Sequence, residues 1–239
     1  MKTLKRNFSF PVILLLLTAL LMNSCKKEDG DYIYDDDGNK YSVVHIGDHY
    51  WMTENLKTMT YNDGTGLLVL QHDALEWASA GPACCVYDPD GVDGIGSEAE
   101  MRTHYGVLYN WYAVNTGKLC PTGWRIPTND EWTELITELG GEAVAGGKMK
   151  STRTEPDDHP RWNSPNTGAT NDGDFRAFPA GCRTSLGEFF DLGYYGYWWT
   201  GTEYDASFAI DWYIPNDDVY IDYEYRKKRS GYSVRCIKE

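Results

Sequence analysis

One short stretch, residues 119–141, limits what this chain can fold into more than any other part of it. Its sequence, LCPTGWRIPTNDEWTELITELGG, contains both ends and the buried face of one helix. Thr128 is suited to cap the helix N-terminus, and Glu131, three residues later, completes a capping box. Gly140 and Gly141 supply a left-handed stop at the other end. A helix this short is marginal alone, so its apolar stripe must pack onto another part of the chain. The stripe recurs at helical spacing and consists of Trp132, Leu135, Ile136 and Leu139.

A second short helix is predicted within residues 105–115, where apolar side chains again recur at helical spacing. The other periodic segments indicate β structure. Residues 41–56 alternate like an N-terminal β-hairpin with its turn at Gly47 and Asp48, and aromatic-rich strands separated by turns fill the chain from residue 175 onward. These patterns predict an α+β fold in which two short helices pack on an antiparallel sheet.

Two long segments, residues 61–97 and 146–174, lack periodicity and are rich in polar residues, Gly and Pro, so both are predicted to be mostly irregular. An excursion as long as the second is usually a functional surface loop or a mobile one. The first contains three carboxylates in a Gly-rich loop that are candidate calcium ligands, although acidic turns are commonly empty. They are Asp88, Asp90 and Asp93. No other metal or cofactor is indicated.

The N-terminus has the pattern of a bacterial lipoprotein signal in residues 1–24. A basic start precedes an apolar run that is too short for a comfortable membrane span, and the run ends at Ser24 and Cys25. This junction resembles a lipobox, which implies cleavage before Cys25 and acylation of that residue. A plain secretory signal is the alternative. Acyl chains on Cys25 would anchor the protein in outer-membrane lipid without a spanning helix.

Residues 25–34 are expected to be the acylated Cys and a polar, acidic tether. Charged residues directly after a lipidated Cys resemble the surface-export signals of Bacteroidota lipoproteins, so we expect an outer-membrane lipoprotein that faces the cell exterior. The formal net charge of the whole chain is −14. That charge argues against nucleic acid as a partner.

Five phrases occur in order along residues 35–239: DDDGNKYSVVHIGDHYWMTENLKT, GVLYNWYAVNTGKLCPTGWRIPTNDEWTEL, NTGATNDGDFRAFPAGCR, GYYGYWWTGTEY and GYSVRCIKE. Together they resemble the Fibrobacter succinogenes major paralogous domain, a family of bacterial surface and secreted proteins. The resemblance implies a C-type-lectin-like fold, in which a Cys ties the helical part to the last strand. On this chain it implies a disulfide between Cys120 and Cys236, which by loop entropy is worth roughly 4–5 kcal/mol. It assigns no partners to Cys84, Cys85 and Cys182.

The phrase WRIPTNDEWTEL is also similar to a helix of the formylglycine-generating enzymes, which share that fold. Those enzymes use a pair of copper-binding cysteines near the C-terminus, whereas Cys236 stands alone there, and no other catalytic set is indicated. We therefore expect no enzyme, but a binding or adhesion module for an extracellular glycan or protein. The alternatives are a structural component of a surface assembly and an oxidase of the formylglycine-generating type.

Aromatic residues of the C-terminal strands are the first candidates for ligand binding, because aromatic faces stack on sugars or anchor interfaces. Consecutive strand residues point to opposite faces, so we expect Trp198 or Trp199 to face solvent unless a loop covers it. The alternative is that both are core residues, in which case the segment 146–174 becomes the candidate. The full aromatic set is Trp198, Trp199, Tyr204 and Trp212.

Overall fold

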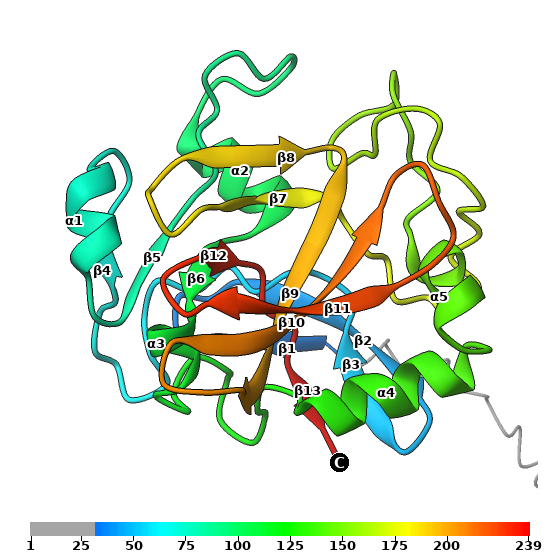
Figure 1. Ribbon diagram of the computed structural model, residues 1–239, viewed down its shortest axis with the longest axis horizontal. Coiled ribbons are helices and arrows are strands. Elements are labelled where there is room, and N and C mark those ends of the chain that lie inside the picture. Colours follow the sequence, from blue (N-terminus) through cyan, green and yellow to red (C-terminus); the bar gives the residue numbers. More distant parts are fainter. Residues whose placement is uncertain (1–31) are drawn as a thin grey trace, which may run out of the picture.

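The computed structural model describes residues 32–239, so the predicted signal segment 1–24, Cys25 and most of the predicted tether lie outside the described residues. Within residues 32–239 the chain forms a mixed α+β domain of mostly antiparallel sheets with five short helices around them (Figure 1). None of the helices in this range is both long enough and apolar enough to cross a membrane.

The first sheet joins the two ends of the domain. Its strands are β1 (Tyr32–Tyr34), β2 (Lys40–Ile46), β3 (His49–Met52) and β13 (Ile237–Lys238), hydrogen-bonded in that order. The predicted hairpin is confirmed, because β2 and β3 pair in antiparallel fashion around a turn at Gly47, whose φ is +60°. β13 pairs with β3, so the hairpin is completed by a strand from the other end of the sequence.

The second sheet runs through the middle of the molecule (Figure 1). It consists of β9 (Tyr195–Glu203), β10 (Phe208–Pro215) and β11 (Asp222–Lys227). The order is β11-β10-β9, so β10 is central and β11 is an edge strand with mostly exposed side chains. Residues 216–221 join β10 to β11.

The third sheet contains strands that the sequence did not predict. Its order is β4 (Leu68–Val69), β5 (Ala83–Cys85), β6 (Leu108–Asn110), β12 (Gly231–Tyr232), β7 (Ala180–Arg183) and β8 (Phe189–Leu192). Residues 61–97 are therefore not only loop, since they supply β4, β5 and α1 (Ala74–Ser79). Residues 184–188 connect β7 to β8.

The helix predicted after Thr128 is confirmed as α4 (Asn129–Glu138). The Thr128 side chain accepts from the Glu131 backbone N–H, and the Glu131 carboxylate accepts from the Thr128 backbone N–H at 2.8 Å, which is the predicted capping box. Trp132, Leu135 and Ile136 are buried, as the apolar stripe predicted.

The helix predicted within residues 105–115 is largely wrong. Residues 108–110 form the strand β6, which pairs with β5 and β12, and the only helix that begins within the segment is the short α3 (Trp111–Val114). The helix that does precede β6 is α2 (Glu98–Tyr105). Pairing with two distant strands has overridden the local helical spacing of this segment.

A fifth helix, α5 (Glu142–Met149), was not predicted because it contains Gly146 and Gly147. Both glycines lie directly against other backbone. A Cβ atom on Gly146 would lie 2.2 Å from the Tyr220 carbonyl oxygen, and one on Gly147 would lie 2.6 Å from the Gly168 carbonyl oxygen. The two glycines therefore allow α5 to pack closely against neighbouring backbone, and they do not mark a flexible loop.

Two hydrophobic clusters fill the interior, one on each face of β9. Trp199 belongs to the first cluster, together with Tyr109 and Tyr232. Trp198 belongs to the second cluster, together with Trp132 and Phe175. Since neighbouring strand residues point to opposite faces, this division shows that both faces of β9 are covered.

Arg235, directly before the last cysteine, is fully buried and joins three parts of the chain. Its Nε donates to Asn55 Oδ1 at 2.9 Å, and its Nη1 donates to the carbonyl oxygens of Met52 at 2.9 Å and Phe175 at 2.6 Å. Its Nη2 donates to the carbonyl oxygen of Arg176 at 2.8 Å. A buried guanidinium with this many acceptors is strongly held in place.

The predicted disulfide is confirmed. Cys120 and Cys236 are bonded, with Cα atoms 5.9 Å apart, so the segment before α4 is tied to the end of the chain. Cys84, Cys85 and Cys182 are thiols without a disulfide partner in the described part of the chain, and all three are buried. Burial raises the pKa of both Cys85 and Cys182 to about 12, which keeps them protonated and unreactive.

Candidate functional site

Three of the four aromatic residues predicted to bind ligand are core residues. Trp198 and Trp199 are 0 % exposed and Trp212 is 1 % exposed. The expectation that Trp198 or Trp199 faces solvent is wrong, because each lies in a hydrophobic cluster on its own face of β9. Trp198 and Trp212 are cross-strand partners within the second cluster.

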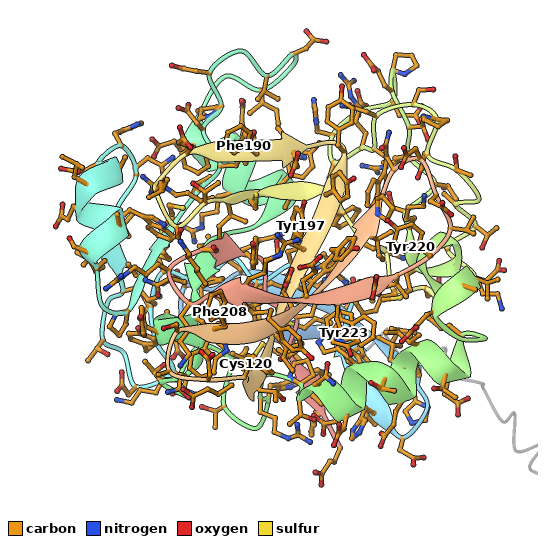
Figure 2. All side chains as sticks on the ribbon, in the orientation of Figure 1. Cys120, Phe190, Tyr197, Phe208, Tyr220 and Tyr223 are labelled. Atoms are coloured by element: carbon orange, nitrogen blue, oxygen red, sulfur yellow. A yellow bond between two sulfur atoms is a disulfide. The ribbon has the colours of Figure 1, made fainter. Side chains whose placement is uncertain are left out.

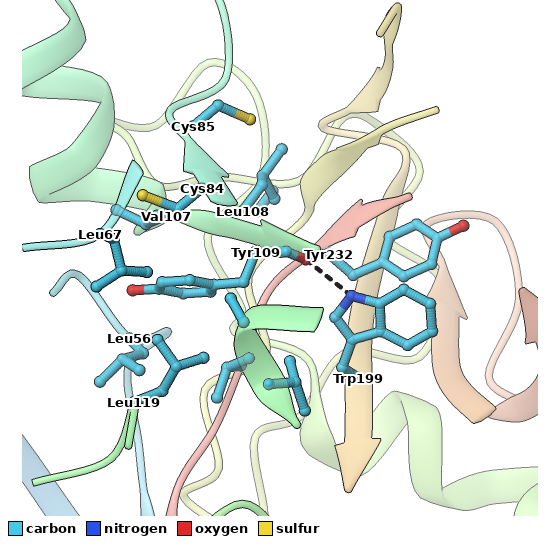
Figure 3. Packing of buried hydrophobic residues seen from close by; sticks show 14 of the residues in the cluster. Leu56, Leu67, Cys84, Cys85, Val107, Leu108, Tyr109, Leu119, Trp199 and Tyr232 are labelled. Atoms are coloured by element: carbon cyan, nitrogen blue, oxygen red, sulfur yellow. Dashed lines mark hydrogen bonds between the residues drawn. The ribbon is translucent and has the colours of Figure 1, made fainter. Parts of the chain in front are cut away.

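The polar atoms of these tryptophans are also satisfied inside the protein. The Trp199 Nε1 donates to the Tyr109 carbonyl oxygen at 2.8 Å (Figure 3). The Trp198 Nε1 donates to Asn55 Oδ1 at 2.9 Å, and the Trp212 Nε1 donates to an asparagine of α4 at 3.0 Å. These side chains are therefore committed to packing and leave nothing free for a ligand.

Tyr204 is the exception, since 55 % of its surface is exposed. Its ring stacks on that of Tyr225 from the edge strand β11, with 3.9 Å between ring centroids. The structure therefore separates Tyr204 from the three tryptophans, and places it on the outer surface of the second sheet.

The irregular segment after α5, residues 150–174, is packed against the rest of the domain and is not a free loop. Trp162 in its middle is fully buried, and its Nε1 donates to the Ala177 carbonyl oxygen at 3.0 Å. Asn166 donates from its amide to the Ser151 carbonyl oxygen, at 3.1 Å. In Figure 1 this segment lies beside the loop of residues 86–97 at one end of the molecule.

A cavity of about 450 Å³ lies between these loops and the β8–β9 connection, and we call it the long-loop cavity. Two tyrosines, Tyr87 and Tyr194, supply aromatic surface, and 51 % of the Tyr194 side chain surface is exposed. The polar part of the lining comes from both loops and includes Asp90, Asp93, Glu155, His159, Arg161 and Asn163. A volume of this size is typical of small-ligand sites.

His159 joins the two loops that form the cavity. Its Nε2 lies 2.7 Å from the carbonyl oxygen of Asp93, which only accepts, so Nε2 carries a hydrogen. Its Nδ1 lies 2.6 Å from the Tyr105 hydroxyl. Burial raises the pKa of Tyr105 to about 12, so this hydroxyl keeps its proton and can donate it to Nδ1.

The backbone of the long segment is held at the same point. The Arg161 backbone N–H donates to the Tyr105 hydroxyl oxygen at 3.2 Å, and the Arg161 guanidinium donates to the Asp157 carbonyl oxygen at 2.7 Å. With both ring nitrogens of His159 engaged, the histidine holds the loops together and is not free to act as a base. The cavity is therefore formed before any ligand arrives.

The three carboxylates predicted as calcium ligands do not form a metal site. In the described residues, no three His, Cys, Asp or Glu side chains converge closely enough to hold a metal ion. Asp88 Oδ1 instead accepts from the Asp90 backbone N–H at 3.0 Å, which stabilises a local turn. Asp90 and Asp93 line the long-loop cavity as separate polar side chains.

Part of this cavity could be located from sequence and part could not. The segment 146–174 was the second candidate, and residues 155–163 of it line the cavity. The roles of His159 and Tyr105 carried no sequence signal, because their contact joins positions that are far apart in the chain.

A model of the Fibrobacter succinogenes major domain matches residues 44–238. No curated protein and no solved structure matches the chain.

Proposed function

Since the chain belongs to the Fibrobacter succinogenes major domain family, we propose that it is a non-catalytic module that binds a glycan at the bacterial cell surface. We assign its fold, within the α+β class, to the C-type-lectin-like group. That assignment is supported by the disulfide from the helical part to the last strand, and by the long loop excursion beside an antiparallel sheet.

The observation that carries the proposed function is the long-loop cavity. Its aromatic surface, on Tyr87 and Tyr194, is suited to stacking on the apolar face of a sugar ring. Its carboxylate, amide and guanidinium groups, on Glu155, Asn163 and Arg161, are suited to hydrogen bonds with ring hydroxyls. The end of a glycan chain fits a preformed, mostly polar hollow, whereas a protein partner ordinarily needs a larger and flatter surface.

The test is to replace Tyr194 with alanine and measure binding of full-length protein, held in detergent, to a glycan array. We expect the unmodified protein to retain at least one glycan, and Tyr194→Ala to weaken that affinity about tenfold, since lost stacking contributes about 1 kcal/mol or more. Tyr34→Ala is the matched control, because Tyr34 is similarly exposed (58 %) but lies in the first sheet, away from the cavity. Retention of no glycan, or equal binding by Tyr194→Ala, would refute the proposal.

We propose that the protein is located on the outer face of the outer membrane and is anchored there by acylated Cys25. The sequence pattern around Ser24 and Cys25 supports this localisation. We expect Cys25→Ala to move the protein from the membrane fraction to the soluble fraction, because the acyl anchor is lost. Detergent-phase partitioning measures this shift, and protease treatment of intact cells reports which side the domain faces. If Cys25→Ala partitions like the unmodified protein, the lipid anchor is wrong.

A further inference from the structure

A second hollow region lies on the side of the domain formed by β8, β9 and β11. It consists of two adjoining hollows of about 470 and 550 Å³ that share Ser185, Phe208 and Lys227 in their linings. Figure 2 shows Phe190, Tyr197 and Phe208 around this region, on β8, β9 and β10. We call it the cationic groove, for the basic residues 226–229 along one wall. It has no lining residue in common with the long-loop cavity.

Residues 226–229 read Arg-Lys-Lys-Arg in a chain whose formal net charge is −14. Lys228 is buried, forms an ion pair with Glu203, and its Nζ lies over the ring of Trp111. Lys227 and Arg229 are exposed and, in the described part of the chain, make neither a side-chain hydrogen bond nor an ion pair. Lys227 and Arg229 therefore both line the groove, and neither charge is paired with a carboxylate of the described residues.

Behind this wall lies a buried carboxyl group whose two oxygens have no hydrogen-bond partner. Asp211 is 0 % exposed, and neither of its carboxylate oxygens has a hydrogen-bond partner. The nearest cation is Arg226, whose Nε is 3.6 Å away, too far for a hydrogen bond, and that Nε also lacks a partner. Unpartnered buried groups of this kind are rare in folded proteins and call for an explanation.

The protonation state of Asp211 affects the net charge of the groove. Burial raises the pKa of Asp211 above its ordinary range, while nearby Arg226 opposes the shift, so the neutral carboxyl form is favoured. A neutral Asp211 does not cancel the charge of Arg226, which lines the groove. One carboxylate, that of Asp191, also lines the groove and accepts from the Tyr197 hydroxyl at 2.9 Å. It is outnumbered there by the cations Arg226, Lys227 and Arg229.

Aromatic surface accompanies these cations. Phe190 is 49 % exposed and Tyr225 is 44 % exposed, and both line the groove. Tyr204 stacks on Tyr225 and extends this surface outside the groove. Cations and exposed aromatic rings in one groove are suited to a ligand that combines sugar rings with negative groups.

We propose that the cationic groove binds an anionic polysaccharide, whose carboxylate or sulfate groups lie on Lys227 and Arg229 and whose rings lie on Phe190 and Tyr225. The negative charge of the rest of the chain does not prevent this. The Debye length is about 8 Å at physiological salt, so distant carboxylates are screened while cations in the groove act at contact distance. Binding at this site is independent of the glycan proposed for the long-loop cavity.

The experiment measures retention of full-length protein, held in detergent, on immobilised polygalacturonate (carboxylated), heparin (sulfated), dextran (neutral) and polyglutamate (an acidic polypeptide). We expect retention on polygalacturonate or heparin that weakens at 1 M salt, and none on dextran. Whichever of the first two is retained identifies the anionic group. The double variant Lys227→Gln/Arg229→Gln should bind about tenfold more weakly, and Phe190→Ala should do the same.

The matched control is Arg176→Gln/Lys238→Gln, which removes the same charge from two exposed positions outside the groove. It should bind within about twofold of the unmodified protein, and thermal melting should show all variants folded. Four results would overturn the proposal: no retention on either anionic polysaccharide, equal binding by the groove variant, an equal loss in the control, or equal retention on polyglutamate. The last result would identify an acidic polypeptide as the ligand instead.

Discussion

Trp199→Ala is expected to destabilise the domain by about 3–5 kcal/mol, which is the usual effect of truncating a large buried aromatic side chain. Trp199 is 0 % exposed, and its ring lies 4.7 Å, centroid to centroid, from that of Tyr232. The substitution leaves a cavity in the first cluster and also leaves the Tyr109 carbonyl oxygen without the indole donor. Because typical domains are stable by only 5–15 kcal/mol, the unfolding midpoint in urea should fall sharply.

Trp198→Ala is expected to have an effect of the same size, although it empties the second cluster instead of the first. The control is Tyr204→Ala, which removes an exposed aromatic ring just beyond the end of β9 and should change the free energy of unfolding by less than about 1 kcal/mol. If either tryptophan can be truncated without moving the urea midpoint, that face of β9 is not a packed core. A loss of glycan binding in a fully stable Trp199→Ala protein would return this residue to the list of ligand contacts.

The second large effect is expected from the disulfide. Replacing both Cys120 and Cys236 with serine opens a loop that spans 116 residues of sequence, so the loop-entropy model predicts a loss of roughly 4–5 kcal/mol. Thermal melting should show a large decrease in midpoint for the double variant. The unmodified protein should show a similar decrease when reductant is added, whereas the double variant should not respond to reductant.

The reductant comparison also provides the control. Cys84, Cys85 and Cys182 stay in both proteins, so any effect of reductant on them would appear in the double variant as well. If complete reduction of the unmodified protein, verified by alkylation of Cys120 and Cys236, leaves its melting midpoint unchanged, the disulfide does not stabilise the domain.

The features that could be predicted from the sequence are those determined by neighbouring residues. The capping box of Thr128 and Glu131 and the apolar stripe of α4 lie within a dozen residues, and the hairpin turn at Gly47 needs only its own two strands. The disulfide and the family followed from resemblance over long phrases, which carries information on distant contacts that no local pattern provides.

The features that were missed depend on distant parts of the chain. α5 contains Gly146 because the Tyr220 backbone passes too close for a side chain, and nothing near Gly146 indicates that approach. Trp198 and Trp199 are both buried because helices and strands cover both faces of β9, and strand alternation alone cannot show this. Likewise the long-loop cavity depends on the contact of His159 with Tyr105, which only the folded chain creates.

The position of β13 and Arg235 also has a consequence for the order in which the protein is made and folded. The N-terminal hairpin is synthesised first, yet β3 pairs with β13, and the Met52 carbonyl oxygen and Asn55 receive hydrogen bonds from Arg235. During synthesis, the N-terminal hairpin therefore has neither β13 nor Arg235 to pair with until the ribosome has made residues 235–238. This arrangement delays completion of the fold until the whole domain has been synthesised. Oxidation of Cys236 with Cys120 would then link the last-made residues covalently to the segment before α4.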